Sequence, residues 1–355
     1  MTVIADRPAS APDLLRVRQD LLDRVERRLD RFTEAERLRW LAINPRAAQP
    51  VEAVIDMVGR GGKRLRPIFC LSAFLAAGGD PGAEVAVDAS AALELLQAFA
   101  LIHDDVIDNS ALRRGAPTIH VRQAGEHSSQ GWQGEARRFG EGVAVLAGDL
   151  AFVYADELTF DFPPPARRLW GELRTELIVG QHLDVAVAAE AVVDPRLSRW
   201  IAVCKSGRYS IQRPLLLGAT LAGRPGLADA FAGYGLALGE AFQLRDDLMD
   251  AFGSTEAAGK PAGLDFAEHK MTLLLALAVE RDPRIRGLLA RDGDAPWDAD
   301  LIRRVLEETG VRDAVERTIG ELVERAVASL APAGLDPVWS DEFSRLATLV
   351  AYRDR

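Results

Sequence analysis

The hydrophobic positions along most of this chain recur every three to four residues, which is the period of an amphipathic α-helix. Alternating runs of β-branched and aromatic residues, the usual sign of a strand, are hard to find. The pattern predicts helices over residues 13–40, 50–59, 65–78, 83–109, 141–159, 166–190, 196–219, 227–252, 267–281, 298–309, 310–331 and 338–352. We therefore expect an all-α protein built as one large helical bundle.

Glycine and proline residues stand at the predicted helix ends, but none of these breaks has the composition of an interdomain linker, and no repeat of fixed period occurs. We expect residues 1–355 to form a single domain, with residues 1–12 flexible. The glycine- and serine-rich segment 113–140 is expected to be a long loop. Loops of that length in compact proteins are usually functional, so we expect it to lie at the active site.

The segment from Val85 to His103 is hydrophobic almost all round. A helix with almost no polar face lies inside a fold, surrounded by other helices. This one nevertheless ends in the acidic sequence DDVID at 104–108. Three carboxylates are therefore expected at the mouth of an apolar interior.

Asp104 and Asp108 are four residues apart, so on a helix their carboxylates share one face, about one turn from each other. Like charges at this spacing repel unless a cation lies between them, although a single DDxxD motif could also be a solvated helix end. The same spacing recurs in the sequence DDLMD at 246–250, again at the end of an apolar helix. Two such helix ends facing each other would frame an all-oxygen site for magnesium and one diphosphate.

The composition of the chain excludes several classes of protein. The formal net charge of −10 argues against a general nucleic-acid binder, because phosphate backbones attract lysine and arginine. The two cysteines, Cys70 and Cys204, are too few for a disulfide framework, which suits a reducing compartment. The first twenty residues lack the apolar core of a signal peptide, and no stretch approaches about 18 uncharged apolar residues. We expect a soluble, cytoplasmic protein with no membrane span and no nucleic-acid partner.

Basic residues accompany both acidic clusters. The turn Gly61-Gly62-Lys63, followed by Arg66, lies at a predicted helix start, where backbone N–H groups and the helix dipole favour an anion. Further cations and one hydroxyl lie near the clusters in the sequence: Arg113, Arg114, Lys205, Ser206, Lys260 and Lys270. Any one of them could be a solvated surface charge. As a set they predict two anion pockets, one bridged by metal and one served directly by lysine and arginine.

With these motifs in this order, the chain resembles the trans-polyprenyl diphosphate synthase family, particularly short-chain members such as farnesyl and geranylgeranyl diphosphate synthases, from about Gly61 to Thr272. The resemblance implies the isoprenoid synthase bundle with a central apolar cavity, a homodimer, and a trinuclear magnesium site at which Mn²⁺ can substitute. It also implies head-to-tail (1′–4) condensation of isopentenyl diphosphate with an allylic diphosphate (dimethylallyl, geranyl or farnesyl) and release of diphosphate.

The resemblance assigns roles residue by residue. The implied magnesium ligands are Asp104, Asp108 and Asp246, supported by Asp105, Asp247 and Asp250. The residues implied to hold isopentenyl diphosphate are Lys63, Arg66 and Arg114. Those implied to bind the allylic diphosphate are Arg113, Lys205 and Lys260, and Lys270 is expected to add to substrate binding. Ser206 stands where the family usually has threonine and keeps the hydroxyl, and Gln243 matches the glutamine thought to stabilise the carbocation.

Gln97 departs from a common family pattern, because many bacterial members have histidine there. Glutamine also occurs at this position and can donate a hydrogen bond to a phosphate oxygen. We expect substrate binding to survive, with a weaker pH dependence than histidine would give.

The implied chemistry agrees with these residue types. Loss of diphosphate from an allylic carbon creates a cation, and magnesium and fixed cations would stabilise the charge that grows on the leaving group. The cation needs a dry apolar pocket. Asp104, Asp108, Asp246, Lys205, Gln243 and Arg113 are expected to be the catalytic set. The released diphosphate is the expected base, since no histidine or glutamate is an obvious candidate.

Product length is expected to depend on how deep the apolar cavity runs along the 83–103 helix. Phe99 lies five residues before Asp104, about 7 Å deeper at the helical rise, although the helical angle favours Ala100 and Leu96 on the Asp104 face. In the family a bulky residue at the Phe99 position limits elongation, and enzymes that make the fifteen-carbon product often add a second aromatic beside it. This chain has Ala100 there. We favour the twenty-carbon geranylgeranyl diphosphate over farnesyl diphosphate, although Phe99 could also be a simple core residue.

Two other functions are open to such a sequence. A class I terpene cyclase would share the helices and the magnesium, but its second cluster is usually an Asn/Ser/Glu motif and it needs no second diphosphate pocket. A non-catalytic synthase subunit would be expected to have lost carboxylates from one cluster, and both clusters are intact here.

Overall fold

The computed structural model describes residues 11–190, 192, 194–253, 263–267, 270–289 and 297–352, and within them the predicted all-α fold is confirmed. The strands in this part of the chain are β1 (Leu112–Arg113) and β2 (Ala116–Pro117), which pair antiparallel in one small hairpin. Residues 1–10 lie outside the described residues, so their predicted flexibility stays a prediction.

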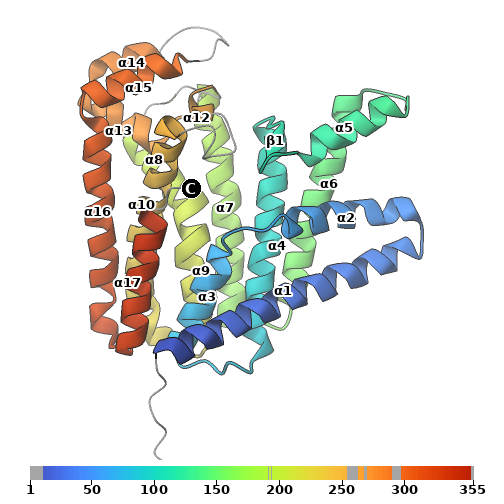
Figure 1. The fold of residues 1–355 in the computed structure, drawn as a ribbon, viewed down its shortest axis with the longest axis horizontal. Coiled ribbons are helices and arrows are strands. Elements are labelled where there is room, and N and C mark those ends of the chain that lie inside the picture. The colour runs from blue at the N-terminus through green and yellow to red at the C-terminus, as the bar shows by residue number, and fades with distance from the viewer. Residues whose placement is uncertain are drawn as a thin grey trace, which may run out of the picture.

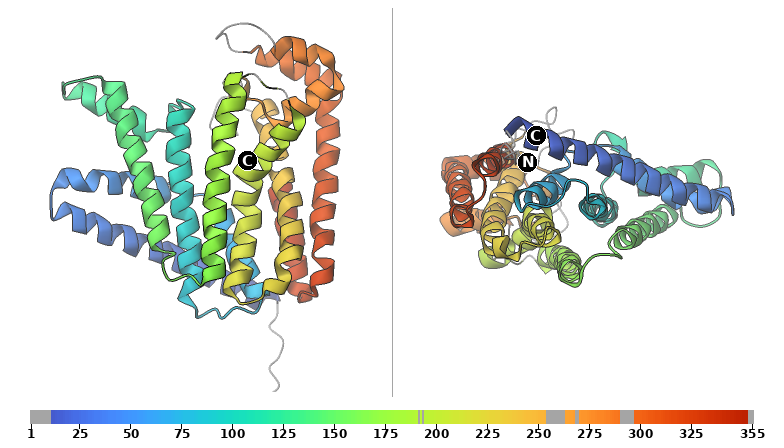
Figure 2. Two further views of the ribbon diagram at one scale, coloured as in Figure 1. Left: turned by 180° about the vertical axis from the view of Figure 1, so that it is seen from behind. Right: turned by 90° about the horizontal axis from the view of Figure 1, so that it is seen from below.

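The helices stand side by side as a bundle, with α1 crossing its lower end (Figures 1 and 2). In chain order the α-helices are α1 (Ala11–Leu41), α2 (Pro45–Gly59), α3 (Leu65–Ala76), α4 (Glu84–Ile107), α5 (Ile119–Ser129), α6 (Ala136–Glu157), α7 (Pro164–Glu190), α8 (Pro195–Ala202), α9 (Arg213–Leu221), α10 (Ala228–Phe252), α12 (Leu264–Ala267), α13 (Leu273–Arg281), α14 (Pro283–Leu289), α15 (Ala299–Glu308), α16 (Val311–Ser329) and α17 (Pro337–Ala351). A π-helix, η1 (Val203–Gln212), separates α8 from α9, and the 3₁₀ turns are η2 (Pro225–Leu227) and η3 (Ala331–Ala333).

The apolar helix α4 is the centre of the bundle and packs against α1, α2, α3, α6 and α9. Leu93, Leu95 and Leu96 are fully buried, as the lack of a polar face predicts. Among the described residues α4 is also long and apolar enough to cross a membrane, but 67% of its apolar window is buried inside the fold. Burial in the core therefore accounts for its composition. The expected cytoplasmic location stays a prediction.

The long loop expected over 113–140 is wrong for most of its length. The segment contains the β1–β2 hairpin and α5, and α6 begins at Ala136, five residues before its predicted start. Gly115 occupies a left-handed turn at φ +75° within the hairpin. Gly140 lies inside α6, where an added Cβ would come within 2.2 Å of the His120 carbonyl oxygen of α5. The glycines thus mark one turn and one close helix contact, not a continuous loop.

The helix predicted over 196–219 is present as α8, η1 and α9, which follow one another without a gap, but its middle part is π-helical. The π-helical segment η1 packs closely on α10, and two glycines make this approach possible. A Cβ added to Gly207 would lie 2.9 Å from the carbonyl carbon of Gly239, and one added to Gly239 would lie 2.5 Å from Cα of Gly207. Side chains on either side of this contact are therefore held close to the second acidic cluster.

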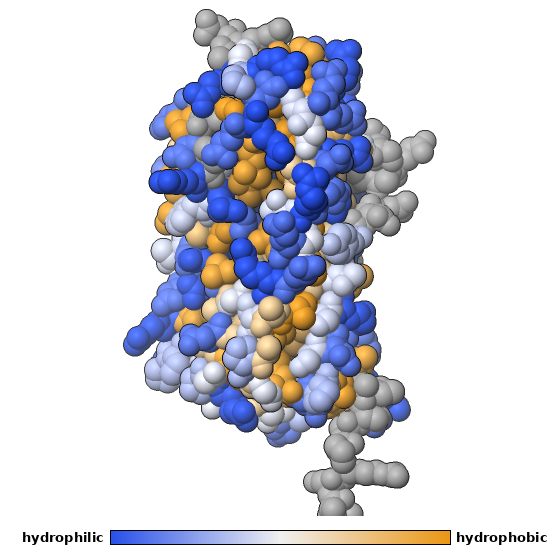
Figure 3. Space-filling model, turned by 90° about the vertical axis from the view of Figure 1, so that its left-hand side faces the viewer, coloured by the Kyte–Doolittle hydropathy of each residue, from blue (hydrophilic) through white to orange (hydrophobic). Residues whose placement is uncertain are grey.

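The two sides of the bundle differ in their surfaces. The side of α16, seen in Figure 3, carries many hydrophilic residues around smaller hydrophobic patches. Exposed apolar side chains also occur on α6 and α7, whose ribbons are seen from behind in the left panel of Figure 2. They are Val145, Leu146 and Val153 of α6 and Val179 of α7, whereas the exposed Ile178 and Val185 of α7 face an internal cavity.

Candidate active site

Two adjoining cavities lie between the central helices of the bundle. The first, of about 670 Å³, is lined mainly by α4, α7 and η1. The second, of about 600 Å³, is lined by the glycine turn before α3 and by α4. Arg66, Gln97, Leu101 and Asp246 line both cavities. Two ligands bound side by side would therefore meet at these residues.

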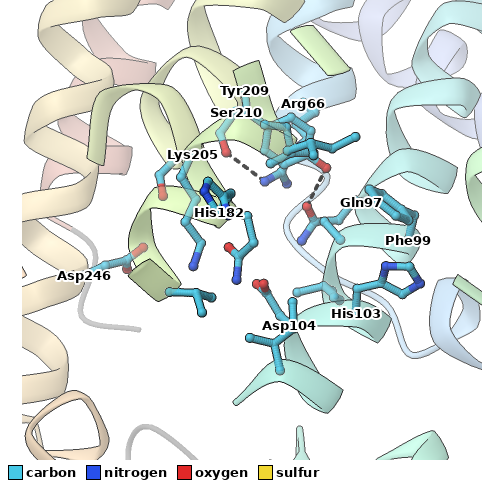
Figure 4. Close-up of a pocket in the computed structure, with 18 of the residues that line it drawn as sticks. Arg66, Gln97, Phe99, His103, Asp104, His182, Lys205, Tyr209, Ser210 and Asp246 are labelled. Atoms are coloured by element: carbon cyan, nitrogen blue, oxygen red, sulfur yellow. Dashed lines mark hydrogen bonds between the residues drawn. The ribbon is translucent and has the colours of Figure 1, made fainter. Parts of the chain in front are cut away.

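Carboxylates from the two acidic clusters reach the same cavity. Asp104, at the end of α4, and Asp246, near the end of α10, both line the first cavity. Figure 4 shows Asp104 and Lys205 pointing into one opening, with Asp246 on the α10 side of it. The third carboxylate of the first cluster, Asp108, accepts a hydrogen bond from Lys270 Nζ at 2.9 Å, which ties the end of α4 to the segment after α12.

The surroundings of the Asp104 carboxylate favour a bound cation. Burial raises the pKa of Asp104 above its usual value, while the positive charge of Lys205 opposes the shift. No hydrogen bond from a described residue reaches this carboxylate. Burial alone would lower the pKa of Lys205, but Asp104 and Asp184 outweigh it and the net shift is upward. Lys205 Nζ lies 2.7 Å from Asp184 Oδ2, so the lysine stays charged beside the cavity.

Three other carboxylates of the clusters make hydrogen bonds to side chains or backbone groups of the protein. Arg113 Nε donates to Asp105 Oδ1 at 2.7 Å. Asp247 accepts hydrogen bonds from Gln243 Nε2 at 2.7 Å and from a backbone N–H of α13, and burial raises its pKa to about 7. Asp250 Oδ2 accepts from the backbone N–H of Asp265 at 3.1 Å. These contacts are consistent with the role that the family resemblance implies for the three residues, which is to support the magnesium ligands.

The donor set fits magnesium. Among the described side chains, no three carboxylates, imidazoles or thiols gather as a ready-made metal cage. Magnesium does not need one, because it keeps several waters and is usually bound by one or two carboxylates together with substrate phosphates. Asp104 and Asp246 supply hard oxygen donors from opposite sides of one cavity. A half-buried carboxylate that has a raised pKa and accepts no hydrogen bond from the described residues is a group that a divalent cation would stabilise.

The second cavity gathers the cations of the glycine turn. Lys63, Arg66 and Arg114 all line it. The guanidinium of Arg114 donates to the backbone oxygens of Arg60, at 3.1 Å, and Gly61, so the hairpin is fastened over the turn. Burial and neighbouring cations lower the pKa of Arg114 from its usual value. A bound anion would stabilise the positive charge of this guanidinium.

The residues expected at the allylic diphosphate are distributed over several places. Lys205 and Ser206 line the first cavity and also a third cavity of about 120 Å³. Gln243 and Lys270 line only this third cavity. Arg113 lines none of the three and is paired with Asp105. Lys260 lies outside the described residues.

The apolar depth of the first cavity ends near Phe99. Phe99 and Ala100 line the cavity, whereas Leu96, about one turn deeper than Ala100, is fully buried and lines neither large cavity. The interpretation of Leu96 as a length-setting residue is therefore not supported. The Phe99 ring packs against His103 and Phe152, with ring centroids 4.7 and 4.9 Å away.

Sequence reasoning missed several residues of these walls. Tyr209 and Ser210 of η1 contact Gln97 and Arg66, and Gln181, His182 and Asp184 of α7 face Lys205 or the first cavity. Gln181 and Asp184 are three residues apart in the mostly apolar second half of α7, which puts an amide and a carboxylate on one face. That spacing was a usable signal. For Tyr209 none was available, because its partner lies in a distant helix.

The fold is an all-α bundle. Aspartate clusters from two helices reach an apolar cavity, and a second cavity beside it is lined by lysine and arginine. This combination defines the class of helical proteins that handle diphosphates with divalent metal ions. The Polyprenyl synthetase family model matches residues 48–308. The chain therefore belongs to the polyprenyl synthetase family and is by class a prenyltransferase, as its motifs predicted.

Known proteins agree with this placement. The crystal structure of a geranylgeranyl pyrophosphate synthase from Corynebacterium glutamicum, complexed with isoprenyl diphosphate and magnesium, superposes with a TM-score of 0.86 at 36% identity, covering 96% of this chain and 99% of that one. A farnesyl diphosphate synthase of Geobacillus stearothermophilus is 35% identical over 61% of this chain and 72% of its own length. A short chain isoprenyl diphosphate synthase of Methanothermobacter thermautotrophicus is 34% identical over 63% of this chain and 65% of its own length.

We predict that the two clusters bind a magnesium–diphosphate complex together. Mg²⁺ with inorganic diphosphate should raise the melting temperature of the unmodified protein by about 3–6 °C, because a ligand that binds only the folded state stabilises it. Asp104→Asn and Asp246→Asn should each remove most of this shift. Asp149→Asn is the matched control, because Asp149 lies on α6 with its side chain 59% exposed. Equal shifts in all four proteins, measured by differential scanning fluorimetry, would contradict a shared site.

Proposed function

We propose that this protein is a short-chain trans-prenyl diphosphate synthase, which condenses isopentenyl diphosphate with an allylic diphosphate head to tail (1′–4) and releases diphosphate. The observation that carries the proposal is the pair of adjoining cavities. One combines carboxylates with an apolar depth, which suits an allylic diphosphate and its hydrocarbon chain. The other presents Lys63, Arg66 and Arg114, which suits a second diphosphate.

In this proposal Asp104, Asp108 and Asp246 hold magnesium, with Asp105, Asp247 and Asp250 in support. When bound, the metal neutralises charge that develops on the departing diphosphate. Lys205 is already charged and held by Asp184, so it can stabilise the same oxygens without reorganising. The apolar walls below them exclude water from the allylic cation. The proposed site holds three magnesium ions, and Mn²⁺ can substitute for them.

The second substrate would lie in the cavity of the glycine turn. Lys63, Arg66 and Arg114 bind its diphosphate, and its double bond is directed to the shared boundary of the two cavities. Bond formation there would place the new carbon–carbon bond next to the departing diphosphate. The proton lost afterwards is accepted by the released diphosphate, which Lys205 would keep in place together with the magnesium that the carboxylates would hold.

The direct test is release of inorganic diphosphate, measured with each substrate alone and with both. We expect release only when isopentenyl diphosphate and an allylic diphosphate are present together, because the double bond of one substrate must attack the cation of the other. A terpene cyclase would release diphosphate from the allylic substrate alone, and a non-catalytic subunit would release none. Either of these outcomes would overturn the proposed function.

We further propose geranylgeranyl diphosphate as the main product, with farnesyl diphosphate as the alternative. On α4 Phe99 and Ala100 are the deepest apolar residues of the cavity wall, and the Phe99 ring packs against Phe152 and His103. Ala100 beside it leaves room that a second aromatic side chain would fill. A relative of similar fold carries the name geranylgeranyl pyrophosphate synthase, and another is named farnesyl diphosphate synthase.

Phe99→Ala should lengthen the product by at least one isoprene unit, because removing the ring opens the floor of the cavity. The check is chromatography and mass spectrometry of products formed from farnesyl plus isopentenyl diphosphate. Phe160→Ala is the control, since Phe160 is 78% exposed beyond α6 and contributes nothing to the cavity. An unchanged product profile in Phe99→Ala would contradict the proposal that Phe99 limits product length.

We also propose that the protein forms a homodimer through α6 and α7. Four apolar side chains of these helices that line none of the three cavities are exposed: Val145, Leu146 at 62%, Val153 at 56% and Val179. Burying such a patch against a second copy would remove apolar surface from water.

Leu146→Glu should shift the protein from the mass of two chains to that of one in size-exclusion chromatography with light scattering, because it places a charge in the proposed interface. Leu349→Glu is the matched control, since Leu349 is 51% exposed on α17, outside that surface. A monomeric unmodified protein, or equal behaviour of the two variants, would count against this interface.

A further inference from the structure

Gln97 lies at the boundary of the two cavities, and its carboxamide has two chemically opposite ends. The oxygen accepts hydrogen bonds, whereas the nitrogen donates two. A phosphate oxygen attracts the nitrogen and repels the oxygen. If the carboxamide can rotate freely, it therefore presents the wrong end for part of the time. The orientation of Gln97 decides whether this position helps or hinders a bound diphosphate.

The hydroxyl of Tyr209 fixes that orientation. Tyr209 Oη donates to Gln97 Oε1 at 2.8 Å, joining η1 to α4 across the cavity wall. Figure 4 shows the oxygen of Gln97 directed at Tyr209 and its nitrogen directed into the opening. Tyr209 is 3% exposed and burial raises its pKa, so its hydroxyl remains protonated and able to donate.

The ring of Tyr209 also supports Arg66, which lies at the same boundary and carries a positive charge. The guanidinium carbon of Arg66 lies 4.1 Å from the centroid of the Tyr209 ring, within the range of a cation–π contact. Arg66 Nη2 donates to Ser210 Oγ at 2.7 Å. Tyr209 thus contacts two hydrogen-bond donors, Gln97 and Arg66, that line both cavities.

We propose that Tyr209 is a positioning residue, which acts through Gln97 to present amide N–H groups to the diphosphate of isopentenyl diphosphate. This inference rests on the proposed function and adds to it the residue that orients the boundary between the two substrates. It predicts that the Tyr209 hydroxyl matters for the second substrate and not for the allylic one.

The test is a double-mutant cycle with Tyr209→Phe, Gln97→Ala and the double variant. Tyr209→Phe keeps the ring over Arg66 and removes only the hydroxyl. We expect it to raise KM for isopentenyl diphosphate about three- to tenfold, with KM for the allylic substrate and kcat nearly unchanged. In the Gln97→Ala background the same substitution should change KM by less than about 1.5-fold, because the side chain it orients is gone.

Tyr234→Phe is the matched control. Tyr234 Oη also makes a buried hydrogen bond, at 2.7 Å to the Phe343 carbonyl oxygen, but lines neither cavity. We expect Tyr234→Phe to lower the melting temperature and leave both KM values unchanged. This separates loss of a buried hydroxyl from loss of orientation.

Two results would overturn the inference while leaving the proposed function intact: an unchanged KM in Tyr209→Phe, or an equal rise in KM with and without Gln97. Calorimetric titration with isopentenyl diphosphate gives a second readout that does not depend on turnover. If the unmodified protein neither binds isopentenyl diphosphate nor condenses it, the proposed function fails and the inference fails with it.

Discussion

Repulsion between carboxylates at the mouth of an apolar cavity is the constraint on which the rest of this structure depends. Asp104 and Asp246 approach that cavity from two helices whose other residues are mostly apolar. Charges so placed are costly unless opposite charges lie close by. Lys205 and Lys270 provide part of the compensation, and a bound metal–diphosphate complex would provide the rest. The same arrangement separates a charged mouth from a dry depth, which carbocation chemistry requires.

Most of the fold could be predicted from the sequence because helical periodicity is a local property. The ends of α3, α4 and α10 lie within two residues of their predicted positions. The prediction failed over 113–140, where glycines suggested a continuous loop. Gly140 is there because α5 crosses α6 closely, a tertiary reason that no local pattern reveals. The π-helix η1 was missed for a similar reason, since its path is set by contact with α10.

For the site, the sequence identified the residue types and their spacing but not their partners. The placement of Asp104 and Asp246 on one cavity agrees with the prediction from the repeated DDxxD spacing. The engagement of Arg113 with a neighbouring carboxylate, and of Gln97 with Tyr209, could not be foreseen, because each contact depends on how side chains from separate elements meet. Spacing along one helix predicts a shared face. It does not predict which group on another helix will face it.

The most direct measurement is a crystal structure of the protein soaked with magnesium and a non-hydrolysable allylic diphosphate analogue. Our account predicts electron density for metal ions on one diphosphate, with oxygens of Asp104 and Asp246 both within ligand distance. Carboxylates of the two clusters that turn to separate regions of solvent, with the analogue bound elsewhere, would contradict it.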